Sequence, residues 1–278
     1  MANTASMIPM PGRFNEPQSL RQLTRGRGFA AELTGFLIPF ARQDYIYQEF
    51  DFQETAITDN PNAMWAVDNS GGAGAASFAT VANAEEGTIQ GDTGTTDNGG
   101  VSIVYDMISS NADKNPGMHV YMKIDDVSEA GLEIGYSDAK TDENTLAVTD
   151  TDTAALANGV TDGAFIAYDT DGTENGMVLV AGGATDTDTL AAIGDSTAAS
   201  PITDTVFFNA RLQVYANAAY ANMDAGSNTA PDAILDAGLS VGPDADVLMR
   251  PSIVCVTRNT TAKFPVIDLI RIWRNRYA

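Results

Sequence analysis

The stretch that decides the fold closes the chain: Lys263-Phe264-Pro265-Val266-Ile267-Asp268-Leu269-Ile270-Arg271-Ile272-Trp273-Arg274-Asn275-Arg276-Tyr277. β-branched and aromatic residues dominate it and a proline stands near its start, which is typical of a β-strand entered through proline. Alternation sorts its apolar residues onto two faces, with Ile267, Leu269 and Trp273 on one and Val266, Ile270 and Ile272 on the other. Because a strand that is apolar on both faces belongs inside a sheet, the last strand of the chain is predicted to be a central one.

Shorter strand-like segments precede it, several of them with alternating polar and apolar residues, separated by turn residues such as Asn98-Gly99. They are residues 45–53, 101–105, 118–124, 132–136, 164–168, 177–180, 206–215 and 253–257. No long helical pattern interrupts them, so the sequence predicts an all-β fold, an antiparallel jelly-roll β-sandwich over residues 46–278. Residues 137–162 and 182–204, rich in Asp, Thr, Ala and Gly, are expected to form solvated loops with short edge strands at most.

Residues 1–45 have a different composition. Prolines and glycines break any regular element there, and arginines alternate with isolated aromatic residues. This pattern predicts an extended, mostly irregular N-terminal arm that lies on another molecule. The alternative, that the arm packs on its own body, stays open. The candidate binding residues of the arm are Arg13, Phe14, Arg21, Arg25, Arg27 and Phe29.

The net charge of −22 is unevenly distributed. Residues 1–50 hold five arginines and four acids, whereas residues 51–250 hold 32 acids and five basic residues. An acidic body of this kind repels nucleic acid, while the basic arm suits an acidic protein surface. No apolar run approaches the roughly 20 residues that cross a bilayer, and the N-terminus lacks a secretory pattern. We therefore expect no nucleic-acid or membrane partner and synthesis in the cytoplasm.

Few residues of the sequence point to chemistry. His119 is the only histidine and lies on the polar side of a predicted strand, and Cys255, the only cysteine, lies in an apolar one. No serine or cysteine stands in a nucleophile-elbow context, so a Ser-His-Asp site is not predicted. One histidine and one cysteine cannot supply a typical zinc ligand set. Residues 169–174 resemble half of a calcium loop, but a hairpin turn is the favoured interpretation. The sequence thus predicts no cofactor and no metal.

One pattern is compatible with catalysis. Glu49, Asp51 and Glu54 match the E-x-D-x-x-E spacing of some jelly-roll glycoside hydrolases, in which two carboxylates act as nucleophile and acid/base. With 37 acids in the chain, a chance match to so loose a spacing is easy. We therefore predict that the protein is not an enzyme.

Four short segments carry a resemblance: residues 47–52, 65–72, 96–103 and 266–273. They resemble an opening strand, the segment after it, an Asp-Asn-Gly turn and a closing strand of tailed-bacteriophage virion proteins with a concanavalin-like jelly-roll body. The resemblance implies a capsid decoration (cement) protein. Such a protein sits on the exterior of the virion, binds the major capsid protein and stabilises the lattice by bridging neighbouring subunits. A homotrimer fits the three-fold positions of such lattices.

An alternative function remains open at this point. A jelly-roll of this kind also suits a carbohydrate-binding or carbohydrate-cleaving appendage of the virion that recognises the host. Its candidate residues are Glu49, Asp51 and Glu54.

Overall fold

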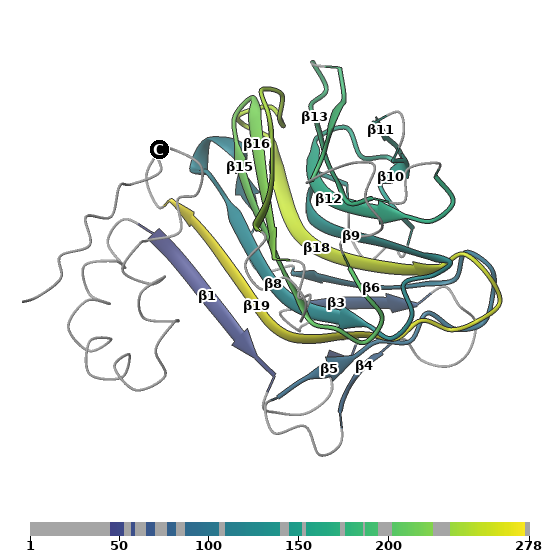
Figure 1. Cartoon of the computed structure of the whole chain (residues 1–278). Coiled ribbons are helices and arrows are strands. Elements are labelled where there is room, and N and C mark those ends of the chain that lie inside the picture. The colour runs from purple at the N-terminus through teal and green to yellow at the C-terminus, as the bar shows by residue number, and fades with distance from the viewer. Residues whose placement is uncertain are drawn as a thin grey trace, which may run out of the picture.

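The structure is a computed structural model. It describes residues 45–52, 57–58, 65–69, 77–81, 87–105, 109–139, 145–151, 154–172, 176–185, 187–193, 202–224 and 234–275. Two antiparallel sheets pack face to face as a sandwich (Figure 1), and the predicted all-β jelly-roll class is confirmed. The arm predicted for residues 1–45 lies almost entirely outside the described residues.

The first layer is a nine-stranded sheet. Its order is β17-β16-β15-β8-β19-β5-β4-β2, and β1 pairs with β19 beside β5. Its strands are β1 (Tyr45–Asp51), β2 (Ile57–Thr58), β4 (Ser77–Thr80), β5 (Ile89–Gln90), β8 (Gly117–Ile124), β15 (Phe208–Tyr215), β16 (Ala218–Asp224), β17 (Ile234–Leu239) and β19 (Pro265–Asn275).

The second layer is an eight-stranded sheet. Its order is β14-β13-β12-β9-β18-β6-β3, and β7 pairs with β18. Its strands are β3 (Trp65–Asn69), β6 (Gly100–Tyr105), β7 (Ser110–Asn111), β9 (Ala130–Ser137), β12 (Gly163–Asp169), β13 (Val178–Gly182), β14 (Thr189–Ala192) and β18 (Leu248–Thr257). A short 3₁₀-helix, η1 (Ala112–Lys114), precedes β8, and β10 (Val148–Asp150) pairs with β11 (Ala155–Leu156) outside both layers.

β19 lies inside its sheet, as predicted: it pairs with β8 on one side and with β1 and β5 on the other. The predicted division of its two faces is partly wrong. The pairing with β8 shifts between Ile267 and Leu269, so Asp268 is an extra residue and the alternation slips there. Ile267 therefore joins Ile270 and Ile272 in the core, while Val266, whose partner is Lys123, lies on the opposite face with Trp273.

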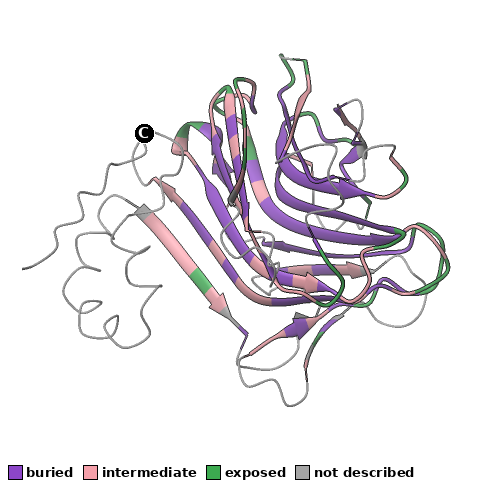
Figure 2. Cartoon of the chain, in the orientation of Figure 1, coloured by how far each residue is buried: buried purple, intermediate pink, exposed green. Residues whose placement is uncertain are grey.

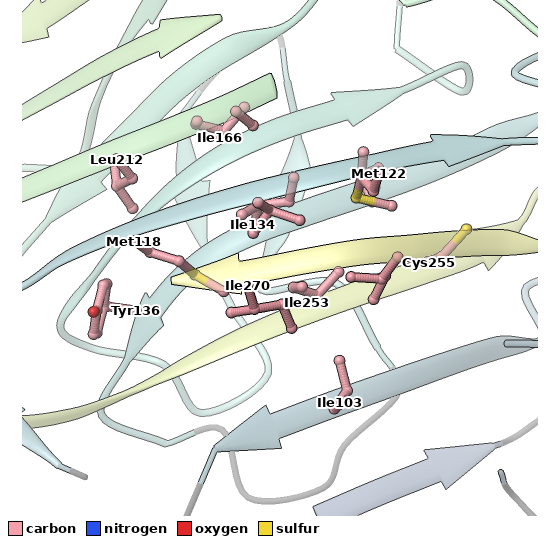
Figure 3. Close-up of a cluster of buried hydrophobic side chains, with 14 of the residues drawn as sticks. Ile103, Met118, Met122, Ile134, Tyr136, Ile166, Leu212, Ile253, Cys255 and Ile270 are labelled. Carbon is pink, nitrogen blue, oxygen red and sulfur yellow. The ribbon is translucent and has the colours of Figure 1, made fainter. Parts of the chain in front are cut away.

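The core fills the space between the two sheets (Figure 3). The nine-stranded sheet contributes Met118, Met122, Leu212 and Ile270 on its inner face, and the eight-stranded sheet contributes Ile103, Ile134, Tyr136, Ile166, Ile253 and Cys255. The Tyr136 hydroxyl also donates a hydrogen bond to the Gly117 carbonyl at 2.9 Å and so ties the layers together. Most of the central strands are buried along their length (Figure 2).

Residues 137–162 depart from the prediction of a solvated loop. The hairpin β10–β11 lies beside β12 (Figure 1), and Val148 and Val160 pack with Phe165 and Val180 in a second cluster on the outer face of the eight-stranded sheet. Small apolar residues suffice there, because Glu133 fixes the segment: its fully buried carboxylate accepts the Ala147 and Val148 amides at 2.8 and 2.5 Å. The sequence did not predict this packed segment, because its small apolar residues lie among Asp, Thr and Gly, a composition that is typical of loops.

Candidate functional site

The outer face of the nine-stranded sheet, turned away from the core, carries a row of polar side chains. Directly opposite residues of antiparallel strands share a face, with Cβ atoms roughly 4.5–5.5 Å apart. Successive pairings therefore align one residue from each of β1, β19, β8, β15, β16 and β17. They are Glu49, Arg271, His119, Arg211, Asn222 and Asp236. We call these six residues the polar row.

One end of the polar row is an ion pair across two strands. Arg271 Nε donates to Glu49 Oε2 at 2.7 Å, and the Tyr47 hydroxyl donates to the same oxygen at 2.7 Å. The Glu49 side chain is 41% exposed and that of Arg271 is 12% exposed. The pair joins β1 to β19 and, because one partner is well solvated, contributes modestly to stability.

His119 continues the row under its neighbours, with only 3% of its surface exposed. Its Nε2 lies 2.8 Å from Asn209 Oδ1, and its Nδ1 lies 3.3 Å from the Arg271 guanidinium NH1. A guanidinium only donates hydrogen bonds, so Nδ1 must be the acceptor. We assign the neutral imidazole that carries its proton on Nε2, where it donates to the Asn209 side-chain oxygen.

The other end of the row is built from amides and carboxylates. Asn222 accepts from Arg211 NH1 at 3.4 Å and donates to Asp236 Oδ1 at 2.8 Å. In the adjoining register, the Asn209 side-chain amide donates to Asp224 Oδ2 at 3.5 Å. Arg211, Asn209 and Asp224 are half-buried and Asp236 is exposed. These side chains therefore present donors and acceptors at the surface of β15, β16 and β17.

A second row of the same face is buried. Trp273 pairs with Gly117, and its indole Nε1 donates to Gln213 Oε1 at 3.0 Å. Gln213 is buried, and its Nε2 donates to the Asn115 and Pro116 carbonyls at 2.8 and 2.9 Å. Trp273 is only 1% exposed. Trp273 and Gln213 thus form a buried base of this face, which we call the floor, and not an accessible surface.

Two aromatic pairs lie on the accessible part of the outer face, and both are half-buried. Tyr121 and Phe207 stack with ring centroids 4.8 Å apart, and Lys123 Nζ lies 4.8 Å from the Phe207 centroid. Tyr215 and Tyr220 meet edge to face at 5.8 Å. These four rings have no place in the main hydrophobic core. Aromatic side chains that remain partly in water beside hydrogen-bonding groups are a feature of ligand-binding surfaces.

Glu49 is the one predicted site residue whose side chain the structure describes. Glu49 lies on the outer face, where it pairs with Arg271. Asp51 belongs to β1, but its side chain is not described. Glu54 lies outside the described residues. So do the arm residues Arg13, Phe14, Arg21, Arg25, Arg27 and Phe29, whose binding role stays a prediction.

The outer face was not predicted as a site, although part of its pattern is visible in the sequence. Phe207, Asn209, Arg211, Gln213 and Tyr215 alternate with the core residues of β15. Aromatic residues therefore stand at both ends of this outward face. The rows across strands, however, depend on pairings between residues far apart in the sequence.

Four titratable side chains away from the outer face serve the fold: Cys255, Tyr136, Tyr105 and Asp169. Burial raises the pKa of the Cys255 thiol to about 12, which makes it an inert buried thiol. Burial also raises the pKa of Tyr136 and, against a hydrogen bond with Gln48, the pKa of Tyr105. At the predicted hairpin turn after β12, both carboxylate oxygens of Asp169 accept from Arg258.

No group of three or more His, Cys, Asp or Glu side chains within the described residues is arranged to hold a metal ion. No helix in that part of the chain is long and apolar enough to cross a membrane.

No protein-family model matches the chain, and its sequence matches no curated protein. Several solved structures share its fold. Peanut lectin superposes with a TM-score of 0.51 at 11% identity, covering 83% of this chain and 97% of the lectin. Arcelin-5, a lectin-like defense protein from Phaseolus vulgaris, gives a TM-score of 0.51 at 8% identity over 83% of this chain and 99% of its own. Lectin II from Ulex europaeus gives 0.51 at 9% identity over 81% and 98%.

Identities this low establish the fold and nothing further. The chain has the concanavalin-like jelly-roll fold that these legume lectins share, which agrees with the jelly-roll expected from the sequence.

Proposed function

We propose that this chain is a non-enzymatic binding protein whose jelly-roll body binds carbohydrate on the outer face of the nine-stranded sheet. The observation that carries the proposal is the composition of that face: two half-exposed aromatic pairs flank amide, guanidinium and carboxylate groups. A sugar ring offers C–H groups that pack on an aromatic face and hydroxyls that both donate and accept. The face supplies partners for each of these groups.

The arrangement around Glu49 supports binding without cleavage. A glycosidase needs a carboxylic acid that gives its proton to the leaving oxygen and a second carboxylate across the bond. Glu49 Oε2 already accepts hydrogen bonds from Tyr47 and Arg271, so that oxygen is occupied. Such a carboxylate suits a structural ion pair better than a proton donor.

A glycan array followed by calorimetry on the purified chain tests the proposal. We expect a defined set of glycans to bind and the variants Phe207→Ala and Tyr220→Ala to weaken that binding at least tenfold. Thermal unfolding of each variant reports whether the fold is kept. The proposal fails if no glycan binds, or if both variants fold and bind as the parent does.

A second candidate function is the bridging of a bacteriophage capsid lattice, as the sequence resemblance implies. It is favoured by the division of charge along the chain, with five arginines in residues 1–50 and 32 acids in residues 51–250. The arm would bind the major capsid protein on the virion exterior, with the protein as a trimer at the three-fold positions of the lattice. The acidic body would face solvent. The two functions are compatible, since one uses the arm and the other uses the sheet.

The two candidates separate in one experiment on the full chain. Replacing Arg13, Arg21, Arg25 and Arg27 by glutamine should abolish binding to assembled capsid shells and leave glycan binding intact. Shell binding that survives this change would overturn the bridging role of the arm. Light scattering on the same samples measures whether the chain is a trimer.

A further inference from the structure

The outward face of β15 has an ordered composition. Phe207 immediately precedes the strand, which then presents Asn209, Arg211, Gln213 and Tyr215. An aromatic residue thus stands at each end of this face, with polar residues between. The eight residue steps from Phe207 to Tyr215, at roughly 3.4 Å each for extended chain, separate the two aromatic positions by about 27 Å, the length of roughly five pyranose units. One monosaccharide therefore cannot reach both ends.

Each aromatic end is reinforced by a neighbouring strand. Phe207 stacks on Tyr121 of β8 at 4.8 Å and 26° between the ring planes. Tyr215 meets Tyr220 of β16 at 5.8 Å and 82°. The Tyr220 ring lies over Gly238 of β17, where a Cβ would come within 2.8 Å of it. Both ends are thus held by packing before any ligand arrives, which lowers the ordering cost of binding.

The middle of the strand presents hydrogen-bonding side chains at the surface, next to a buried side chain that is fixed by its own hydrogen bonds. Asn209 and Arg211 are half-buried and keep surface that a ligand can reach. Gln213 is buried and bonded to Trp273 and to the Asn115 and Pro116 carbonyls. It therefore acts as a floor below the surface residues rather than as a contact.

The charges beside β15 cancel. Lys123 and Arg211 supply two cations, and Asp224 and Asp236 supply two carboxylates. A nucleic acid or another polyanion needs a surplus of basic side chains, which this surface lacks on a chain of net charge −22. The surface therefore matches an uncharged ligand rich in hydroxyl groups.

We propose that this face binds an internal stretch of a linear, uncharged glycan of about five units, lying along β15 with its ends stacked on the Tyr121–Phe207 and Tyr215–Tyr220 pairs. This inference rests on the proposed carbohydrate-binding function and names the ligand class for that same site. It distinguishes recognition of a polysaccharide chain from recognition of a terminal sugar.

The test is the dependence of affinity on ligand length. Calorimetry with cello-, chito- and manno-oligosaccharides of one to six units should show, for the preferred series, affinity that rises to about five units and then levels off. Phe207→Leu and Tyr215→Leu, which keep an apolar side chain and remove the ring, should each lower affinity for the pentasaccharide about tenfold. Phe264→Leu, at a half-buried aromatic in the segment before β19, is the matched control and should bind as the parent does.

The outcomes separate this inference from the function on which it rests. A monosaccharide that binds as tightly as the pentasaccharide overturns the inference and leaves carbohydrate binding standing. Length-dependent binding that both leucine variants leave unchanged, with near-ultraviolet circular dichroism confirming their folds, also overturns it. Tighter binding of polygalacturonate than of any neutral glycan contradicts the uncharged ligand. Absence of binding to every glycan overturns both proposals.

Discussion

Trp273 of β19 lies across Gly117 of β8, its partner in the pairing of the two strands. A Cβ built on Gly117 would come within 2.3 Å of the indole ring, closer than any real contact. The absence of a side chain at Gly117 is therefore what lets the ring reach Gln213 and close the floor of the outer face.

Replacing Gly117 by alanine should destabilise the protein by about 1–3 kcal/mol, because the ring or the strand must move to make room in a packed site. Urea unfolding followed by tryptophan fluorescence measures the change. Gly176→Ala is the control, since a Cβ there meets nothing within 4 Å. Equal stability of the two variants would show that the indole does not depend on Gly117.

Glu133 anchors residues 147–148 through two backbone amides, and Glu133→Gln should loosen that segment. A glutamine side chain has only one accepting oxygen, so at least one buried amide loses its partner at a cost of about 1–3 kcal/mol. Hydrogen exchange should accelerate at Ala147 and Val148 together with a fall in the urea midpoint. The same substitution at exposed Glu129 should change neither quantity.

The sheet pattern was predictable where alternation is local. The inward residues of β8 and β15 and the central position of β19 follow from period-two patterns and from a strand apolar on both faces. The two faces of β19 were not predictable in full, because the extra residue at Asp268 is a property of the pairing with β8. A one-residue slip of this kind exchanges the faces and leaves no mark in the sequence.

The candidate site was less predictable than the fold. The sequence singles out Glu49 and His119 for unrelated reasons, yet both contact Arg271 in the structure. Arg271 lies 222 residues after Glu49 and 152 residues after His119. No local pattern records which residues become cross-strand partners over such separations. The composition of β15 alone carried a usable signal.

Acid should remove the contribution of the ion pair between Asp126 and buried Lys263. Burial by itself raises the pKa of Asp126, but hydrogen bonds from Lys263 and Ser128 outweigh it, so the pKa of Asp126 falls below its ordinary value of 3.8. A lowered carboxylate pKa stabilises the folded state above that ordinary value, and the contribution is lost as pH falls through the lowered pKa.

The measurement is the urea midpoint of the parent and of Asp126→Asn between pH 7 and pH 2.5. The parent should be more stable than the variant at pH 7, and the difference should shrink below about pH 4. Asp246→Asn, which removes an exposed carboxylate in the turn before β18, is the control for the loss of one negative charge. A difference for Asp126→Asn that stays constant down to pH 2.5 would show that the pair does not stabilise the fold.

The His119 assignment predicts a single neutral tautomer in the native protein. Because Arg271 NH1 faces Nδ1 and Asn209 Oδ1 faces Nε2, the proton belongs on Nε2 at neutral pH. A long-range proton–nitrogen NMR spectrum tests this without ambiguity, since the chain has one histidine. The Arg271→Met variant removes the donor to Nδ1 and should let the other tautomer appear. A native spectrum with the proton on Nδ1, or on both nitrogens at pH 7.5, would mean that Arg271 does not hold the ring and that the polar row is broken at His119.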